Sequence, residues 1–193
     1  MVARVTVPAS AEAFTGKPSG DKSLAVARGL LAEPFPLAQV NSSRTLATQA
    51  LLAVLVPVAF GTTVSGVAYC IETPAAGTLP TGVFVALYDL TGVQLAVSAD
   101  VKALANWNAQ GVFSSPFAAP WVVTQDGAVY AAILKNGVYG TTEPKIAAMA
   151  AVAGSGAKLG ANAAGAATQA AQATPPSPAV LSANDSYPWL ALV

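Results

Sequence analysis

A series of short apolar segments between residues 45 and 140 most constrains what this chain can fold into. Each segment is rich in Val, Leu, Ile or aromatic residues and ends at a cluster of turn-forming residues, which is typical of β-strands. The expected strands are 48–58, 64–72, 82–89, 93–97, 111–117, 121–124 and 128–135. Two of the turns, Leu90-Thr91-Gly92 and Gln125-Asp126-Gly127, have the composition of β-hairpins. Because no long helical segment separates the strands, the sequence predicts an all-β fold, an antiparallel β-sandwich of jelly-roll type.

Residues 1–44 differ in character from the strand series. They contain many of the chain's few charges and two turn-rich pieces, at 16–20 and 33–36. A short helix is expected at 21–32, where Leu24, Ala27, Leu30 and Leu31 fall on one face and Asp21 can cap the start. A helix of this length is not stable alone. We therefore expect residues 1–44 to form an extended N-terminal arm that becomes ordered against another surface.

Residues 45–193 are expected to form one domain with an unusual C-terminal part. The segment 147–173 consists largely of Ala and Gly, which fits either a solvated linker or a closely packed extended chain. The prolines of 174–178 then stiffen the chain toward polyproline geometry. The last seven residues are apolar and β-prone, so they predict a closing strand that docks on the sheet begun near Thr48.

The charge content excludes several classes of function. Nine basic and nine acidic residues cancel, so no net field attracts nucleic acid or an anionic membrane.

The longest apolar run, 50–60, is much shorter than the ~20 residues of a membrane span and contains Pro57. No apolar stretch follows Arg4, so we expect no secretory signal and synthesis in the cytoplasm. Only 9% of residues are charged, which predicts that copies of the chain or other partners cover much of its surface.

The residue types needed for catalysis and metal binding are scarce. Histidine, the commonest general base and metal ligand, is absent from the sequence. The single Cys70 allows no intrachain disulfide, and its apolar surroundings predict a buried, unreactive thiol. The acidic residues are spread singly, and Asp89 and Asp126 adjoin turns where a carboxylate accepts local backbone hydrogen bonds. The sequence therefore predicts no enzymatic activity, no cofactor and no metal site.

Aromatic residues are the remaining candidates for a binding site. Trp107 lies in an expected helical turn at 99–109, and both Trp107 and Tyr139 have asparagines nearby in loop-like segments. These two residues are the candidate contacts for a glycan or a partner, because exposed rings can stack on sugars or seal interfaces. The alternative is that they fill the core, where aromatic side chains are also common. Tyr88 and Tyr130 alternate with aliphatic residues in strands, which favours the core for both.

Three pieces of the strand series are similar to a known module. The segments GTTVSGV (61–67), PTGVFVALYD (80–89) and LAVSAD (95–100) resemble a β-sandwich surface module of tailed-bacteriophage virion proteins. That module occurs in minor tail, tail-fibre and head-decoration proteins, especially of phages that infect actinobacteria. Trp107 and the pieces 128–134 and 188–191 fit the same pattern. The resemblance covers residues 45–193 and consists of strand and turn patterns without catalytic residues.

The resemblance implies a non-enzymatic structural component of a virion, displayed on the particle surface and held by its N-terminal arm. It also implies association with copies of itself, here expected as a homotrimer, and with the major capsid or tail proteins. The protein would be made in the host cytoplasm and located in the virion, on either the capsid or the tail. The alternative function is a carbohydrate-binding or host-receptor-binding β-sandwich module, with a host surface glycan as partner.

Overall fold

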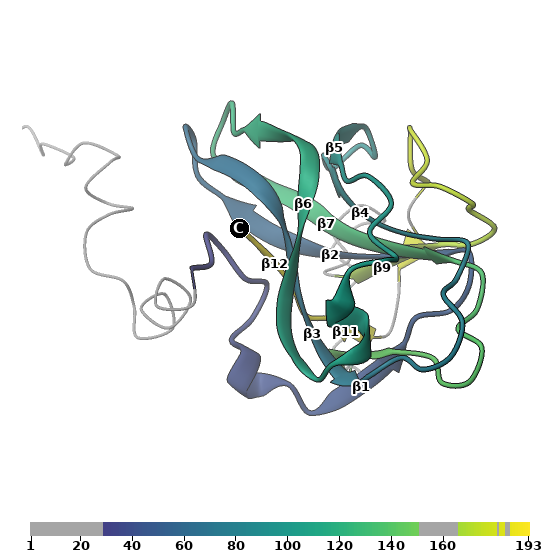
Figure 1. Cartoon of the computed structure of the whole chain (residues 1–193). Coiled ribbons are helices and arrows are strands. Elements are labelled where there is room, and N and C mark those ends of the chain that lie inside the picture. Colours follow the sequence, from purple (N-terminus) through teal and green to yellow (C-terminus); the bar gives the residue numbers. More distant parts are fainter. Residues whose placement is uncertain (1–28, 151–165, 181, 184–185) are drawn as a thin grey trace, which may run out of the picture.

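The computed structural model describes residues 29–150, 166–180, 182–183 and 186–193. The described part of the chain is nearly all β, with 53% of its residues in strands and 4% in helix, and its strands form two antiparallel sheets (Figure 1). The predicted all-β sandwich is therefore confirmed. Most of the expected helix at 21–32 and the middle of the Ala/Gly-rich segment lie outside the described residues.

The first sheet, sheet A, is organised around its longest inner strand, β3. Its members are β1 (Ser42–Thr45), β3 (Thr63–Thr73), β6 (Gly111–Val122), β8 (Lys145–Ala150), β11 (Ser186–Pro188) and β12 (Leu190–Leu192). On one side β3 pairs with β6, and on the other it pairs with β8 and β12. Since β11 pairs with β8 and β12 with β3, the C-terminal chain lies between these two strands.

The C-terminal strand is thus confirmed, but its predicted partner is wrong. The sheet begun near Thr48 is the other one, because β2 (Ala50–Val58) belongs to sheet B. Both edges of β2 are already occupied, one by β7 (Gly127–Asn136) and one by β9 (Ala166–Gln169). The C-terminus instead fills the gap where β3 and β8 diverge in sheet A.

Of the two predicted hairpins, one lies in sheet B and the other does not form. Its strand order is β10 (Ser182–Ala183), β9, β2, β7, β4 (Gly82–Tyr88) and β5 (Gln94–Val97). The hairpin between β4 and β5 is confirmed by their antiparallel pairing. The predicted hairpin at Gln125-Asp126-Gly127 is wrong, since this turn joins β6 of sheet A to β7 of sheet B. The expected strands 111–117 and 121–124 are one continuous strand, β6, whose pairing with β3 shifts register between Val64 and Gly66.

The turn at 123–126 crosses between the sheets because it is fastened to the neighbouring β2–β3 crossover. Val123 exchanges backbone hydrogen bonds with that crossover, accepting from Gly61 N (2.9 Å) and donating to Thr62 O (2.9 Å). The Asp126 carboxylate accepts a further bond from Phe60 N (2.7 Å). Asp126 therefore satisfies a backbone donor on a distant turn, and the bonds that would close a local hairpin are directed elsewhere.

Apolar side chains lie on both faces of each sheet. Between the sheets, the core includes Val54 and Val56 of β2, Tyr69 of β3 and Leu190 and Leu192 of β12, all almost fully buried. The outer face of sheet B carries a second buried cluster, formed by Leu51, Ala53, Ala86, Tyr88, Tyr130, Ala132, Leu134 and Ala179. Tyr88 and Tyr130 are thus buried, as predicted, but on the outer side of the sheet.

The outer face of sheet A is covered by residues 30–41, which we call the strap. Leu30 is buried there, and Phe35, Leu37 and Val40 pack against a cluster made by Ala68, Ala147, Trp189 and Ala191. The strap includes one short 3-10 helix, η1 (Leu37–Gln39), and leads directly into β1. The domain boundary expected between residues 44 and 45 therefore falls inside a strand of sheet A.

Candidate interaction surface

Four loops meet at the end of the sandwich where β3 and β7 finish: 46–49, 74–81, 98–110 and 137–144. Hydrogen bonds join each loop to another. They run from Gly137 N to Thr48 Oγ1 (2.7 Å), from Ala75 N to Trp107 O (2.8 Å), from Thr141 N to Ala76 O (3.0 Å) and from Gly140 N to Thr78 O (3.1 Å). We call these four segments the loop end. Because the loops hold one another in place, a partner that binds here pays little entropy to order them.

Two glycines permit the close approach of these loops. Gly77 has φ 94°, and a Cβ there would lie 2.6 Å from Thr141 N. Gly137 has φ 87°, and a Cβ there would lie 2.8 Å from Thr81 N. Both positions combine a left-handed backbone with backbone atoms too near for any side chain, so glycine is required.

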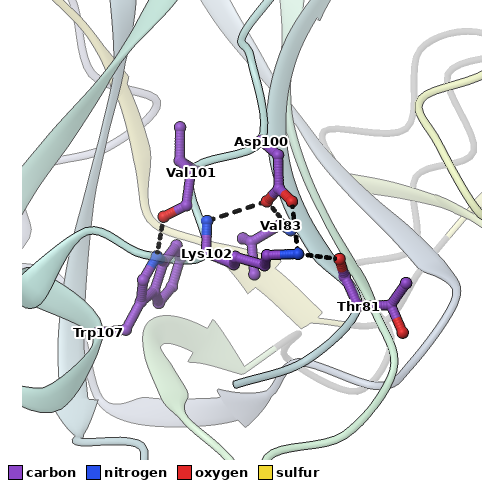
Figure 2. Close-up of polar contacts among 6 residues, drawn as sticks. All are labelled: Thr81, Val83, Asp100, Val101, Lys102 and Trp107. Carbon is purple, nitrogen blue, oxygen red and sulfur yellow. Dashed lines mark hydrogen bonds and ion pairs between the residues drawn. The ribbon is translucent and has the colours of Figure 1, made fainter.

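A charged network fastens the loop 98–110 to the start of β4 (Figure 2). The Asp100 carboxylate accepts hydrogen bonds from Val83 N and Lys102 N, both 3.0 Å, and lies 3.2 Å from the Lys102 ammonium. Lys102 Nζ also donates to Thr81 O at 2.7 Å. Burial alone would raise the pKa of Asp100, but these donors and the Lys102 charge outweigh it and lower the pKa below its usual value.

Trp107 does not offer its ring to solvent. It sits in η2 (Ala105–Asn108), which matches the expected helical turn, but its side chain is fully buried. The ring stacks on Tyr69 with centroids 4.8 Å apart, and its Nε1 donates to Val101 O at 3.0 Å. The Tyr69 hydroxyl in turn shares a hydrogen bond of 2.9 Å with Ser115 Oγ. In this arrangement no face of Trp107 is open to a sugar.

Tyr139 is also placed in the core, with 5% of its surface exposed. Its hydroxyl is buried and has no hydrogen-bond partner among the described residues. Burial, together with the negative charges of Tyr69, Glu143 and Asp100 when ionised, raises the pKa of this hydroxyl well above its usual range. The group therefore stays neutral at physiological pH. The structure brings Tyr139 and Trp107 to the same end of the sandwich, but neither forms an exposed aromatic platform.

A buried lysine also lies at this end of the sandwich, and the sequence pattern does not predict its burial. Lys135 is 1% exposed and faces the space between the sheets, since it pairs in β7 opposite the inward-facing Val83. Its Nζ donates to the Glu143 carboxylate and lies 5.9 Å from the Tyr139 ring centroid. The one available signal was a lone charge at the end of the apolar strand AAILK. The pair fastens the 137–144 loop to the end of β7.

The structure also places the two remaining candidate residues from the sequence, Asp89 and Cys70. Asp89 accepts bonds from Thr91 N (2.8 Å), Thr91 Oγ1 (2.7 Å) and Val93 N (2.9 Å), which is the turn role predicted for it. Cys70 forms no disulfide and is partly buried on the outer face of sheet A, next to the strap cluster. Among the described residues, no group of three or more Cys, Asp or Glu side chains lies close enough to hold a metal ion.

Large apolar side chains are exposed on three of the four loops of the loop end. Leu79, Leu104 and Val138 have 47%, 39% and 60% of their surface exposed, each on a different loop. At the opposite end, Phe60 on the β2–β3 crossover is 69% exposed and Val122 at the end of β6 is 53% exposed. Exposed apolar side chains of this kind can pack against another protein.

Comparisons with known proteins add no family: no protein-family model matches the chain, and no curated protein matches its sequence. In the part of the chain that the structure describes, no helix is long and apolar enough to cross a membrane. The functional argument therefore depends on the residues of this chain and on the surface they form.

Proposed function

We propose that this chain is a non-enzymatic structural component of a tailed-phage virion, displayed on the particle surface as a minor tail or capsid decoration protein. The observation that carries the proposal is the described surface, where large apolar side chains are exposed at both ends of the sandwich. The whole chain carries only 9% charged residues and no net charge, so little repulsion keeps copies apart. The resemblance to phage surface modules points to a virion, where such a surface would contact neighbouring subunits.

The same surface supports a multi-copy assembly, which we propose to be a homotrimer. Closed symmetry buries apolar patches without open-ended aggregation. The loop end suits this role because its hydrogen-bonded loops present Leu79, Leu104 and Val138 in fixed positions. The major capsid or tail proteins of the virion are the further partners, with the N-terminal arm as the attachment. The lack of histidine in the sequence, and of clustered acidic residues in the part of the chain that the structure describes, supports a role without catalysis.

The alternative, a glycan-binding or receptor-binding module, has lost its main support. It depended on Trp107 and Tyr139 as an aromatic platform, and both rings are buried. Among the described residues, no other observation favours a sugar site over a protein contact. We therefore do not propose it for this chain.

Native mass spectrometry of the full-length protein at micromolar concentration tests the proposal. We expect the mass of three chains. A Leu79→Glu, Val138→Lys double variant should shift the protein toward the monomer without lowering its melting temperature, because both side chains are exposed. Val180→Lys is a matched control, since Val180 is 71% exposed but lies beside Ala179 over sheet B. A stable monomer that binds neither capsid nor tail preparations would contradict the proposal.

A further inference from the structure

We propose that the strap is exchangeable: where copies of this chain are held close together, the strap of one copy covers the outer face of sheet A of a neighbour. This inference rests on the multi-copy function proposed above and names a second contact, besides the loop end, through which copies are linked. It starts from the way residues 30–41 are attached to the rest of the molecule.

The strap is fastened to the C-terminal strand at its first residues. Leu31 N donates to Leu192 O at 2.7 Å, and Leu192 N donates to Ala32 O at 2.7 Å, so the strap extends the free edge of β12. Next, the Trp189 indole Nε1 donates to Glu33 Oε2 at 3.1 Å and to Phe35 O at 3.2 Å. These bonds join segments more than 150 positions apart in the sequence.

A second set of bonds holds the other end of the strap on β8. Asn41 N donates to Ala148 O at 3.3 Å, and the Asn41 side-chain oxygen accepts from Ala150 N at 3.1 Å. Asn41 precedes β1 directly, so it is the point where the strap joins the body of its own chain. A change of backbone direction near this residue would send the whole strap to another copy.

The face beneath the strap requires a cover. It is formed by Ala68, Ala147, Ala191 and Trp189, all almost fully buried, and none of these side chains is charged. A contiguous apolar face of this kind is a site of association when it is bare. The occupant that fits it is already identified by the structure, because the strap's Leu30, Phe35, Leu37 and Val40 pack on it. Every other copy of the chain presents the same face.

The strap also has little structure of its own to lose. Its described internal backbone bonds are those of η1, from Gln39 N to Pro36 O (2.8 Å) and from Val40 N to Leu37 O (3.1 Å). Pro34 and Pro36 fix two φ angles, which lowers the entropy cost of laying the segment on a surface. The strap is therefore an extended ribbon whose order comes from the face it covers.

An exchanged strap makes the same contacts on a neighbour that it makes on its own chain. The equilibrium between the two arrangements is therefore set by the protein concentration. The strap is joined directly to β1, and by analogy with a short linker its effective concentration at its own face is about millimolar. In dilute solution the strap therefore stays on its own chain. In a close-packed array, the local concentration of neighbouring faces approaches this effective concentration. The strap of one copy then binds the face of a neighbour and links the two copies.

The single Cys70 allows a direct test, because it packs beside the strap cluster on sheet A. A Leu37→Cys variant of the full-length chain places a second thiol on the strap, against the same cluster. A short bismaleimide then joins the two thiols, and denaturing electrophoresis separates crosslinks within a chain from crosslinks between chains. Val180→Cys, an exposed position beside sheet B, reports random collisions.

We expect crosslinks within one chain in dilute protein and crosslinks between chains once the concentration passes the millimolar range, for Leu37→Cys but not for Val180→Cys. Oligomers that form while Leu37→Cys still crosslinks only within its own chain would overturn strap exchange and leave the multi-copy function intact. A protein that stays monomeric at every concentration would overturn both. A Glu33→Gln variant weakens the same bond to Trp189 in both arrangements, so it should leave the fraction of exchanged straps unchanged.

Discussion

At the scale of single residues, Lys135 and Glu143 form an ion pair whose two side chains differ in burial. Lys135 is 1% exposed, whereas the Glu143 side chain is 29% exposed. Glu143→Gln therefore removes the counter-charge of an ammonium in the core, and we expect a loss of about 3–5 kcal/mol in the free energy of unfolding. Lys135→Met leaves a carboxylate that water can reach and fills the space with an apolar chain, so we expect a loss of about 1 kcal/mol.

Urea denaturation of both variants measures this difference. The double variant Lys135→Met, Glu143→Gln is the control, because it removes both charges and should be close to Lys135→Met alone. Equal losses for the two single variants would mean that the buried ammonium is not the decisive group.

Asp100 gives the fold a predictable sensitivity to acid. Its pKa is lower in the folded protein than the usual 3.8, because Val83 N, Lys102 N and the Lys102 ammonium favour the carboxylate over the opposing effect of burial. A lowered folded pKa means that this stabilisation is present above pH 3.8 and is lost as the pH falls through the folded pKa. Asp100→Asn should therefore lower the melting temperature at neutral pH and have a progressively smaller effect as the pH falls through the lowered folded pKa.

Thermal melts of both proteins from neutral pH to about pH 2 check this expectation. Asp89→Asn is a useful comparison, because the pKa of Asp89 is also lowered by local hydrogen bonds that outweigh burial. A constant difference in melting temperature between wild type and Asp100→Asn across this range would contradict the proposed cause.

At the scale of elements, the sequence identifies strands better than their partners. The β4–β5 hairpin could be predicted because Leu90-Thr91-Gly92 joins two short apolar segments and Asp89 binds the turn's own donors. Gln125-Asp126-Gly127 has similar composition, yet it crosses between sheets because Asp126 binds Phe60 N on another turn. Turn chemistry specifies a sharp reversal of the chain. It does not specify which strands pair, because that depends on contacts distant in sequence.

The same limit applies to the candidate site. The polar neighbours of Trp107 and Tyr139 correctly indicate irregular segments at the loop end. Whether a ring in such a segment is exposed depends on how the segment folds back, and Trp107 stacks on Tyr69, 38 positions earlier in the chain. The burial of Lys135 follows from its register opposite Val83, which no local pattern specifies.

At the scale of the whole molecule, the two ends of the described chain are interlocked. β11 and β12 lie between β3 and β8, and the strap lies over them and bonds to Leu192 and Trp189. The C-terminal residues thus contact both the core between the sheets, through Leu190 and Leu192, and the outer cluster, through Trp189 and Ala191. Removing them affects sheet A and the strap together.

Deletion of residues 189–193 is therefore expected to abolish cooperative folding. Trp189, Leu190 and Leu192 are almost fully buried. Truncating one such side chain costs about 2–5 kcal/mol, so losing all three exceeds most of a domain's stability of about 5–15 kcal/mol. Thermal melts followed by far-UV circular dichroism should show no sharp transition. Leu192→Asp should have a similar effect, whereas Val180→Asp, at a position 71% exposed, should melt like wild type. A truncated protein with the wild-type melting temperature would show that the C-terminal strand is dispensable.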